Sequence, residues 1–122
     1  MEKKKYILLK DLEVYQLARE LSRIGWEIYN SLDWQTKKIN GDQFIESTDS
    51  VGANIVEGYS RFHYLDKIKF YYNSRASLSE CNDHWLELLN ERKKVNSQKR
   101  GFTFFLFTHF CSFFYSNISI LP

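Results

Sequence analysis

The residues able to do acid–base, nucleophilic or metal chemistry are few and scattered in this chain. His63, His84 and His109 lie far apart, and neither HExxH nor Glu-x-x-His occurs. Cys81 and Cys111 form no CxxC pair, which predicts neither a zinc site nor a disulfide framework. No glycine-rich run that cradles phosphate is present. The sequence therefore indicates a protein that is not an enzyme and uses no metal or cofactor.

Attraction of a nucleic-acid backbone is a simpler chemistry, because it needs only clustered Lys and Arg. The chain has 17 Lys and Arg against 15 Asp and Glu, and a net charge of +2 does not by itself indicate a polyanion partner. The cations nevertheless form short runs, and ten are candidate phosphate contacts: Lys3, Lys4, Lys5, Lys10, Lys37, Lys38, Lys93, Lys94, Lys99 and Arg100. The alternative is that they are ordinary solubilising charges.

The elements that would position these residues are helices. A length of 122 residues with one Pro suits a single helical domain. Hydrophobic spacing predicts a bundle core in residues 1–92, with helices at about 11–32, 43–59 and 66–92. We expect Asp11 and Asp42 to cap the first two helices, and the polar stretch between them to end in an Asn40-Gly41 turn.

The second predicted helix has an apolar arc and a polar back. The arc, expected to face the core, comprises Ile45, Thr48, Gly52, Ile55, Val56 and Tyr59. Gly52 and Ala53 would let another helix approach closely. The back comprises Ser50, Asn54, Glu57 and Arg61. We expect the last three of these to contact a neighbouring element or subunit.

The third predicted helix is apolar over about half its circumference, which is typical of a helix buried on two sides in a bundle that also oligomerises. Arg75 interrupts this arc. Its stem packs while its head reaches water, or its guanidinium pairs with a carboxylate across the bundle. The expected partner is Glu57, with Glu80 second.

Residues 93–122 differ from the rest of the chain. A basic run ends at Arg100, and Gly101–Pro122 has no charged residue if His109 is neutral. Seven of the ten Phe lie there without helical periodicity, and the interspersed polar residues argue against a membrane segment. We expect an atypical tail in place of a fourth helix, as a frameshift would produce. The alternative is a divergent helix packed in the groove left by the first three.

The beginning of the chain has only a four-residue apolar run, residues 6–9, after Lys3–Lys5. This run is too short for the apolar region of a signal peptide, so we expect a cytoplasmic protein.

Three ordered stretches resemble one family. Asp11–Leu21, DLEVYQLAREL, resembles its opening helix. Ser50–Tyr59, SVGANIVEGY, resembles the signature S-x-x-A-N-I-x-E-G-Y, and Arg75–Glu80, RASLSE, is similar to R-G-S-L-x-E. The family comprises four-helix bundle proteins from open reading frames in intervening sequences of 23S rRNA genes. The resemblance covers about residues 9–92, and its signature or interface positions here are Ser50, Asn54, Glu57, Gly58, Arg61, Arg75 and Glu80.

The resemblance implies an all-α, antiparallel up-down four-helix bundle that forms a homo-oligomeric ring, a pentamer by the family pattern, without enzymatic activity. The family is distantly similar to the accessory protein of diversity-generating retroelements, which binds nucleic acid and a reverse transcriptase. We therefore expect a nucleic-acid-associated accessory protein. The alternative is a structural or protein-binding scaffold.

Three features depart from the family pattern. Gly52 replaces a frequent proline, and Ser60 replaces a second glycine after the signature tyrosine. Glu46 and Asp49 stand where basic residues are common, which weakens the nucleic-acid expectation, and the tail does not look like a fourth helix.

Overall fold

The computed structural model describes residues 7–118, leaving aside within the last helix the side chains of Lys99, Phe102, Thr103, Phe107, Cys111 and residues 113–118. Its elements are the 3-10 helix η1 (Leu9–Asp11), the α-helices α1 (Glu13–Ser31), α2 (Trp34–Thr36), α3 (Asp42–Ser60), α4 (Tyr64–Ser79), α5 (Glu87–Glu91) and α6 (Ser97–Ile118), and the π-helices η2 (Lys37–Gly41) and η3 (Glu80–Leu86). No strand occurs in this range.

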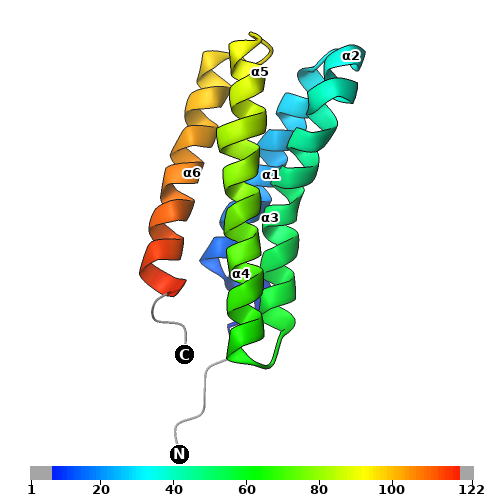
Figure 1. Cartoon of the computed structure of the whole chain (residues 1–122). Helices are drawn as coiled ribbons and strands as arrows, with labels where there is room; N and C mark the ends of the chain where they lie inside the picture. The colour runs from blue at the N-terminus through cyan, green and yellow to red at the C-terminus, as the bar shows by residue number, and fades with distance from the viewer. Residues whose placement is uncertain (1–6, 119–122) are drawn as a thin grey trace, which may run out of the picture.

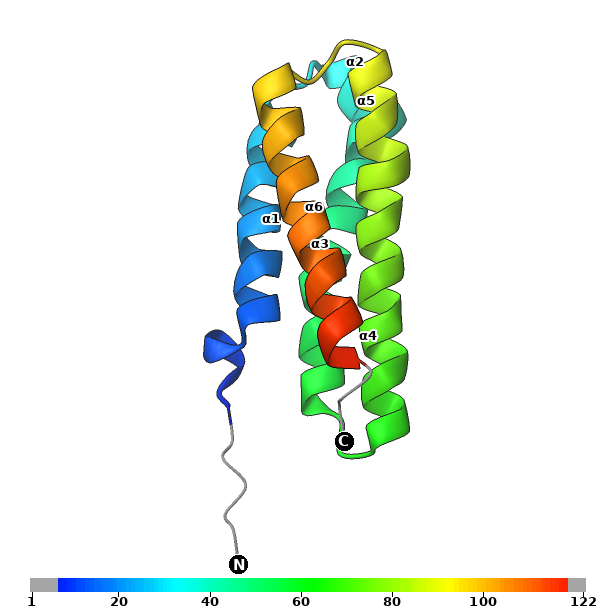
Figure 2. The same cartoon turned by 90° about the vertical axis from the view of Figure 1, so that its left-hand side faces the viewer.

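These elements form four rods that alternate in direction. α2, η2 and α3 follow one another as a single rod, as do α4, η3 and α5, while α1 and α6 are the other two (Figure 1). α1 packs against α3 and α6, and α4 packs against the same two helices (Figure 2). The predicted all-α, antiparallel up-down four-helix bundle is therefore confirmed.

The core of α1 follows directly from its sequence pattern. Apolar residues recur every three or four positions, which places them on one face of a helix. This spacing predicts a core stripe of Val14, Leu17, Ala18, Leu21, Ile24, Ile28 and Leu32. All of these are buried except Leu17, which is partly exposed. The helix begins later than expected, since Leu12 is its N-cap and Asp11 belongs to η1.

The buried face of α3 differs from the predicted arc. Its buried residues are Phe44, Ser47, Thr48, Val51, Ile55 and Gly58, whereas four members of the predicted arc, Ile45, Gly52, Val56 and Tyr59, are only partly buried. The reason is that α3 packs against both α1 and α4, so its buried face lies between the two contacts. Ser74 of α4 donates a hydrogen bond to the Val51 carbonyl at 2.7 Å across this contact.

Two glycines permit the close packing of these helices. A Cβ atom at Gly25 would lie 2.8 Å from Cγ2 of Thr48, and one at Gly58 would lie 2.7 Å from Cε1 of Tyr71. Gly52, which we expected to admit another helix, does face α1, but at an ordinary 3.5 Å from the Ala18 Cβ. Ala53 is exposed.

The connection between the first two rods is helical, so the predicted Asn40-Gly41 turn is wrong. Asn40 and Gly41 end η2 and are buried, and Asp42 continues the helix with αR geometry rather than capping it. The cap is Asp33, whose carboxylate accepts the backbone N–H of Thr36 at 2.8 Å. A glycine fits this position better than a larger residue, because a Cβ atom at Gly41 would lie only 2.9 Å from Cδ1 of Leu32.

The expectation of a tail in place of a fourth helix is wrong. α6 spans Ser97–Ile118 and contributes Leu106 and Phe110 to the core, in the groove between α1 and α4 (Figure 2). The divergent-helix alternative therefore describes the structure. Within the described residues no helix is long and apolar enough to cross a membrane.

Candidate nucleic-acid interface

Two basic runs far apart in the sequence meet at one end of the bundle. Lys37 and Lys38 begin η2, and Arg92, Lys93 and Lys94 follow α5. The up-down order brings both segments to the end where α2 and α5 lie (Figure 1). Lys94 Nζ lies 3.0 Å from Asp33 Oδ2 and so joins the two segments. We call these five cations the basic end.

The helix cap at Asp33 anchors one half of the basic end. Besides the Thr36 N–H, its carboxylate accepts the Thr36 hydroxyl at 2.9 Å and the Lys94 ammonium. These three bonds hold the pKa of the Asp33 carboxyl well below its usual range, and the bond from the backbone N–H of Thr36 has the largest effect. The charged form therefore persists, and it fixes both the start of α2 and the position of Lys94.

The backbone after α5 sets the position of the other half. Lys93 has φ of 57°, in the left-handed region that closes a helix C-terminus. Its N–H donates to the Asn90 carbonyl at 3.0 Å, and the Lys94 N–H donates to Leu89 at 2.8 Å. These bonds satisfy carbonyls at the helix end and leave three consecutive cations exposed.

Aromatic rings accompany the cations. Lys37 Nζ lies 5.0 Å from the ring centroid of Tyr29, and Lys38 Nζ lies 5.4 Å from that of Trp34. Trp34 is 75% exposed, so a face of the indole is accessible. Cations beside an exposed aromatic ring are the combination that binds unpaired nucleic-acid strands.

Acidic residues at this end are fewer than the cations. Glu91 is exposed, and Asp33 is already paired with Lys94. Asp42 accepts the Tyr29 hydroxyl at 2.7 Å, which raises the pKa of that phenol. Lys37, Lys38, Arg92 and Lys93 give the end its positive character.

A cavity of about 320 Å³ opens between the two basic segments. Its lining residues are Thr36, Ile39, Asn40, Arg92 and Lys94. Asn40 is 1% exposed, and neither atom of its amide has a hydrogen-bond partner among the described residues. Sequence reasoning missed Trp34, Asn40 and Arg92, since we interpreted the first two as loop and turn residues and the third as a helix end.

The other predicted phosphate contacts are dispersed. Lys10 lies in η1 at the opposite end of the bundle. Lys3, Lys4 and Lys5 and the Lys99 side chain lie outside the described residues. Arg100 is half-buried: its guanidinium donates to Glu87 Oε2 at 2.5 Å and Asn82 Oδ1 at 3.3 Å, with 19% of the side chain exposed. Arg100 therefore holds α6 against η3 and α5 and is not part of the exposed cationic surface.

The signature residues on the back of α3 form contacts within the helix. The Ser50 hydroxyl donates to the Glu46 carbonyl at 2.8 Å, and Asn54 Nδ2 donates to the Ser50 carbonyl at 2.9 Å. Glu57 pairs with Arg61 at 3.2 Å, both about half exposed. The Arg61 guanidinium also lies 4.7 Å from the Phe70 ring centroid, so it does contact α4.

Arg75 and its second expected partner, Glu80, differ in exposure. Arg75 is half-buried on α4, and Glu80 at the start of η3 is exposed. Glu57, the expected partner of Arg75, is bound by Arg61. A cross-bundle pair of Arg75 stays a prediction.

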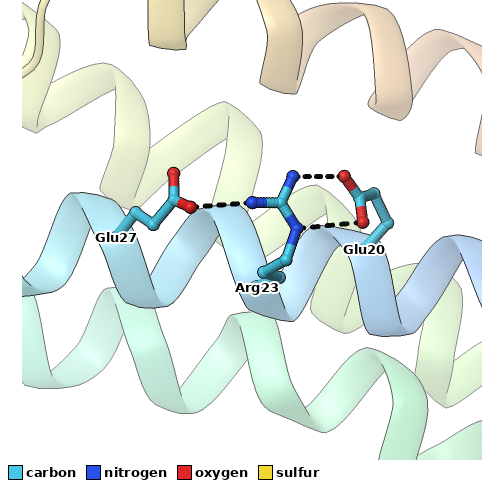
Figure 3. A network of polar contacts seen from close by, with 3 residues as sticks. All are labelled: Glu20, Arg23 and Glu27. Atoms are coloured by element: carbon cyan, nitrogen blue, oxygen red, sulfur yellow. Dashed lines mark hydrogen bonds and ion pairs between the residues drawn. The ribbon is translucent and has the colours of Figure 1, made fainter.

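Another cationic residue, Arg23 of α1, forms ion pairs within its own helix. Its guanidinium is bound by Glu20 at 2.5 Å and Glu27 at 2.7 Å (Figure 3). The Arg23 hydrogen bond lowers the pKa of Glu20. Although Arg23 borders a larger groove of about 550 Å³ toward α6, two carboxylates already neutralise it there.

The nucleophilic and metal-ligating groups do not gather into a reactive centre among the described residues. No three His, Cys, Asp or Glu side chains lie together there as metal ligands. Cys81 is buried, and burial raises the pKa of its thiol to about 12, so the thiol stays protonated at neutral pH.

The fold defines the class of this protein: an up-down four-helix bundle with a cationic end. A family model of the 23S rRNA-intervening sequence protein matches residues 10–101. The match spans more than half of the chain, which therefore belongs to the 23S rRNA-intervening sequence protein family. It extends past residue 92, where the resemblance seemed to end, into the beginning of α6. A search of curated proteins found no match.

Proposed function

We propose that this protein is a non-enzymatic, cytoplasmic accessory protein that binds nucleic acid through the basic end. The observation that carries the proposal is the convergence of the Lys37–Lys38 run with the Arg92–Lys94 run at one end of the bundle, where Arg92 and Lys94 also line a cavity. Phosphate attracts such a cluster without sequence readout, and the exposed Trp34 ring offers a surface for stacking an unpaired base.

We further propose that the chain forms a homo-oligomer, as the resemblance implies. Large apolar side chains on the outside of α4 support this, because Leu65 is 78% and Tyr72 50% exposed. The same surface would serve the second candidate function, a scaffold that docks a protein partner. The two functions differ in charge dependence, since apolar docking is insensitive to loss of the basic end.

Fluorescence anisotropy with labelled single-stranded RNA and DNA would test nucleic-acid binding. We expect affinity to fall steeply as salt rises, because each neutralised phosphate contributes about −0.7 to the slope of log K against log salt for single strands. A variant carrying Lys37→Gln, Lys38→Gln and Lys93→Gln should bind more weakly and show a slope shallower by about 2.

Lys67→Gln with Lys69→Gln is a matched control, because these cations lie on α4 at the other end of the bundle. The control should bind like the unmodified protein. Salt-insensitive binding, or equal loss in both variants, would contradict the proposal and favour the scaffold.

A further inference from the structure

A series of neighbouring aromatic rings and lysines leads from the basic end onto α1. The ring of Trp26 stacks on that of Tyr29, with centroids 5.4 Å apart and an interplanar angle of 19°. Lys37 Nζ lies 5.0 Å from the Tyr29 centroid, and Nζ of the next residue, Lys38, lies 5.4 Å from the Trp34 centroid. We call these five side chains, which come from α1, α2 and η2, the aromatic row.

Both tryptophans of the aromatic row are exposed to an unusual degree for so large an apolar side chain. Trp26 is 53% exposed and Trp34 is 75% exposed. Because Tyr29 covers one face of the Trp26 ring, the exposed part of that indole includes the other face. Each indole therefore offers a flat apolar surface to a ligand.

The charges of the aromatic row favour an anionic ligand. Its two lysines are consecutive in the chain, and each lies beside a ring of the row. Two carboxylates adjoin the row and are already engaged. Asp42 accepts the Tyr29 hydroxyl at 2.7 Å, and Glu27 is bound by Arg23 at 2.7 Å. Cations interleaved with exposed aromatic rings match a strand whose phosphates meet the cations and whose bases stack on the rings.

An unpaired strand can use both features of the aromatic row, whereas a duplex can use only the charge. The bases of a duplex are already stacked on one another and paired, so their faces are closed to an indole on the protein surface. Lysines alone would favour the duplex, because its phosphates are more densely spaced and neutralising each one releases more counterions. A preference for the unpaired strand therefore reports on the rings and not on the charge.

We propose that the aromatic row makes the basic end selective for an unpaired strand, of RNA or DNA, over a duplex. Trp26 and Trp34 each stack on one base, and Lys37 and Lys38 bind the phosphates between these bases. The inference rests on the proposed function. It names the class of nucleic acid and extends the contact from the basic end along α1.

The test compares single-stranded RNA, single-stranded DNA and the duplex of the same DNA sequence by fluorescence anisotropy. The unmodified protein should bind the single strands more tightly than the duplex. Trp26→Leu and Trp34→Leu should each weaken single-strand binding about five- to a hundredfold, the effect of losing one base–aromatic stack, and leave duplex binding unchanged. Phe62→Leu is the matched control and should alter neither, because this 92% exposed ring lies between α3 and α4 at the opposite end of the bundle.

A second measurement uses the unmodified protein alone, so it does not depend on the folding of a variant. Stacking of a base on an indole quenches tryptophan fluorescence. The emission of the protein should therefore fall when either single strand is added and stay constant when the duplex is added.

The outcomes separate this inference from the proposed function. Equal affinity for single strand and duplex, without quenching, would overturn the selectivity and leave the proposed function intact. Failure to bind either form at low salt would overturn both. If Trp26→Leu changes the oligomeric state in size-exclusion chromatography without weakening strand binding, Trp26 belongs to a contact between copies and the aromatic row is overturned as a strand site.

Discussion

Lys93 combines a strained backbone with a surface charge. Its φ of 57° costs a side-chain-bearing residue about 1–2 kcal/mol, a cost that glycine avoids. We expect Lys93→Gly to raise the free energy of unfolding by about 0.5–1 kcal/mol, measured in urea, and to weaken RNA binding. Lys93→Ala should weaken binding equally without the gain in stability. Equal stability of the two variants would show that the left-handed geometry is absent.

Asp33 makes the start of α2 dependent on pH. Its pKa is lowered in the folded protein, so its contribution to stability is present above its unfolded pKa of about 3.9 and is lost as pH falls toward the folded value. We expect Asp33→Ala to melt at a lower temperature than the unmodified protein at pH 7. The difference should shrink progressively below about pH 4. A difference that is constant from pH 7 to pH 2 would contradict the role of the charged carboxylate.

The two glycines of α3 should respond oppositely to the same change. A Cβ at Gly58 meets the Tyr71 ring and lies 3.2 Å from the Lys67 carbonyl, so Gly58→Ala should cost about 1–3 kcal/mol through overpacking. Gly52 has room, and Gly52→Ala should stabilise the helix by about 0.5–1 kcal/mol. Urea unfolding of both variants measures this. Changes of the same sign would contradict the observed helix spacing.

Arg100 links α6 to η3 and α5. Arg100→Met would remove the donor to the buried Asn82 and the partner of Glu87, so we expect a loss of about 1–3 kcal/mol. Arg23→Met, which breaks the exposed network of Figure 3, should leave the melting temperature nearly unchanged. Equal effects would mean that Arg100 is as solvated as Arg23.

Sequence patterns predicted the elements best where one face alone is buried. The α1 stripe is a clear 3.6-residue pattern, and its core was predicted almost completely. On α3 the pattern predicted the buried face only in part, with Thr48 and Ile55 correct, because two helix contacts and the small residues Ser47 and Gly58 shape that face. α6 was missed because the polar residues are scattered among its Phe residues and form no polar face that would reveal a helical period.

The candidate site was predictable only in part. The Lys37 and Lys93 runs were identifiable by composition, but their meeting follows from the up-down order of the rods. Asn40 looked like a turn residue because Asn-Gly is a strong turn signal, and packing of Gly41 against Leu32 overrides it. Arg100 resembled its basic neighbours, and its carboxylate partner lies thirteen residues earlier.

At the scale of the whole molecule, the origin of the last helix is still a prediction. A frameshift near Lys93 would explain why charge vanishes after Arg100, although the family match continues to residue 101 and α6 fills the fourth position of the bundle. Reading the two other frames of the gene downstream of the Lys93 codon tests it. An amphipathic segment of about twenty residues, with Leu or Ile at helical spacing, is expected in one of them. If neither of the two frames encodes such a segment, the frameshift prediction is wrong and the Phe-rich helix is the native fourth helix.

The central claim is that nucleic acid binds at the basic end, and lysine footprinting tests it most directly. The protein is acetylated briefly with and without a saturating single-stranded RNA, and each lysine is quantified by mass spectrometry. Lys37, Lys38 and Lys93 should be protected by bound RNA, while Lys10 and Lys69 at the opposite end should react as before. Uniform reactivity at all five lysines, or protection confined to Lys10 and Lys69, would contradict the account.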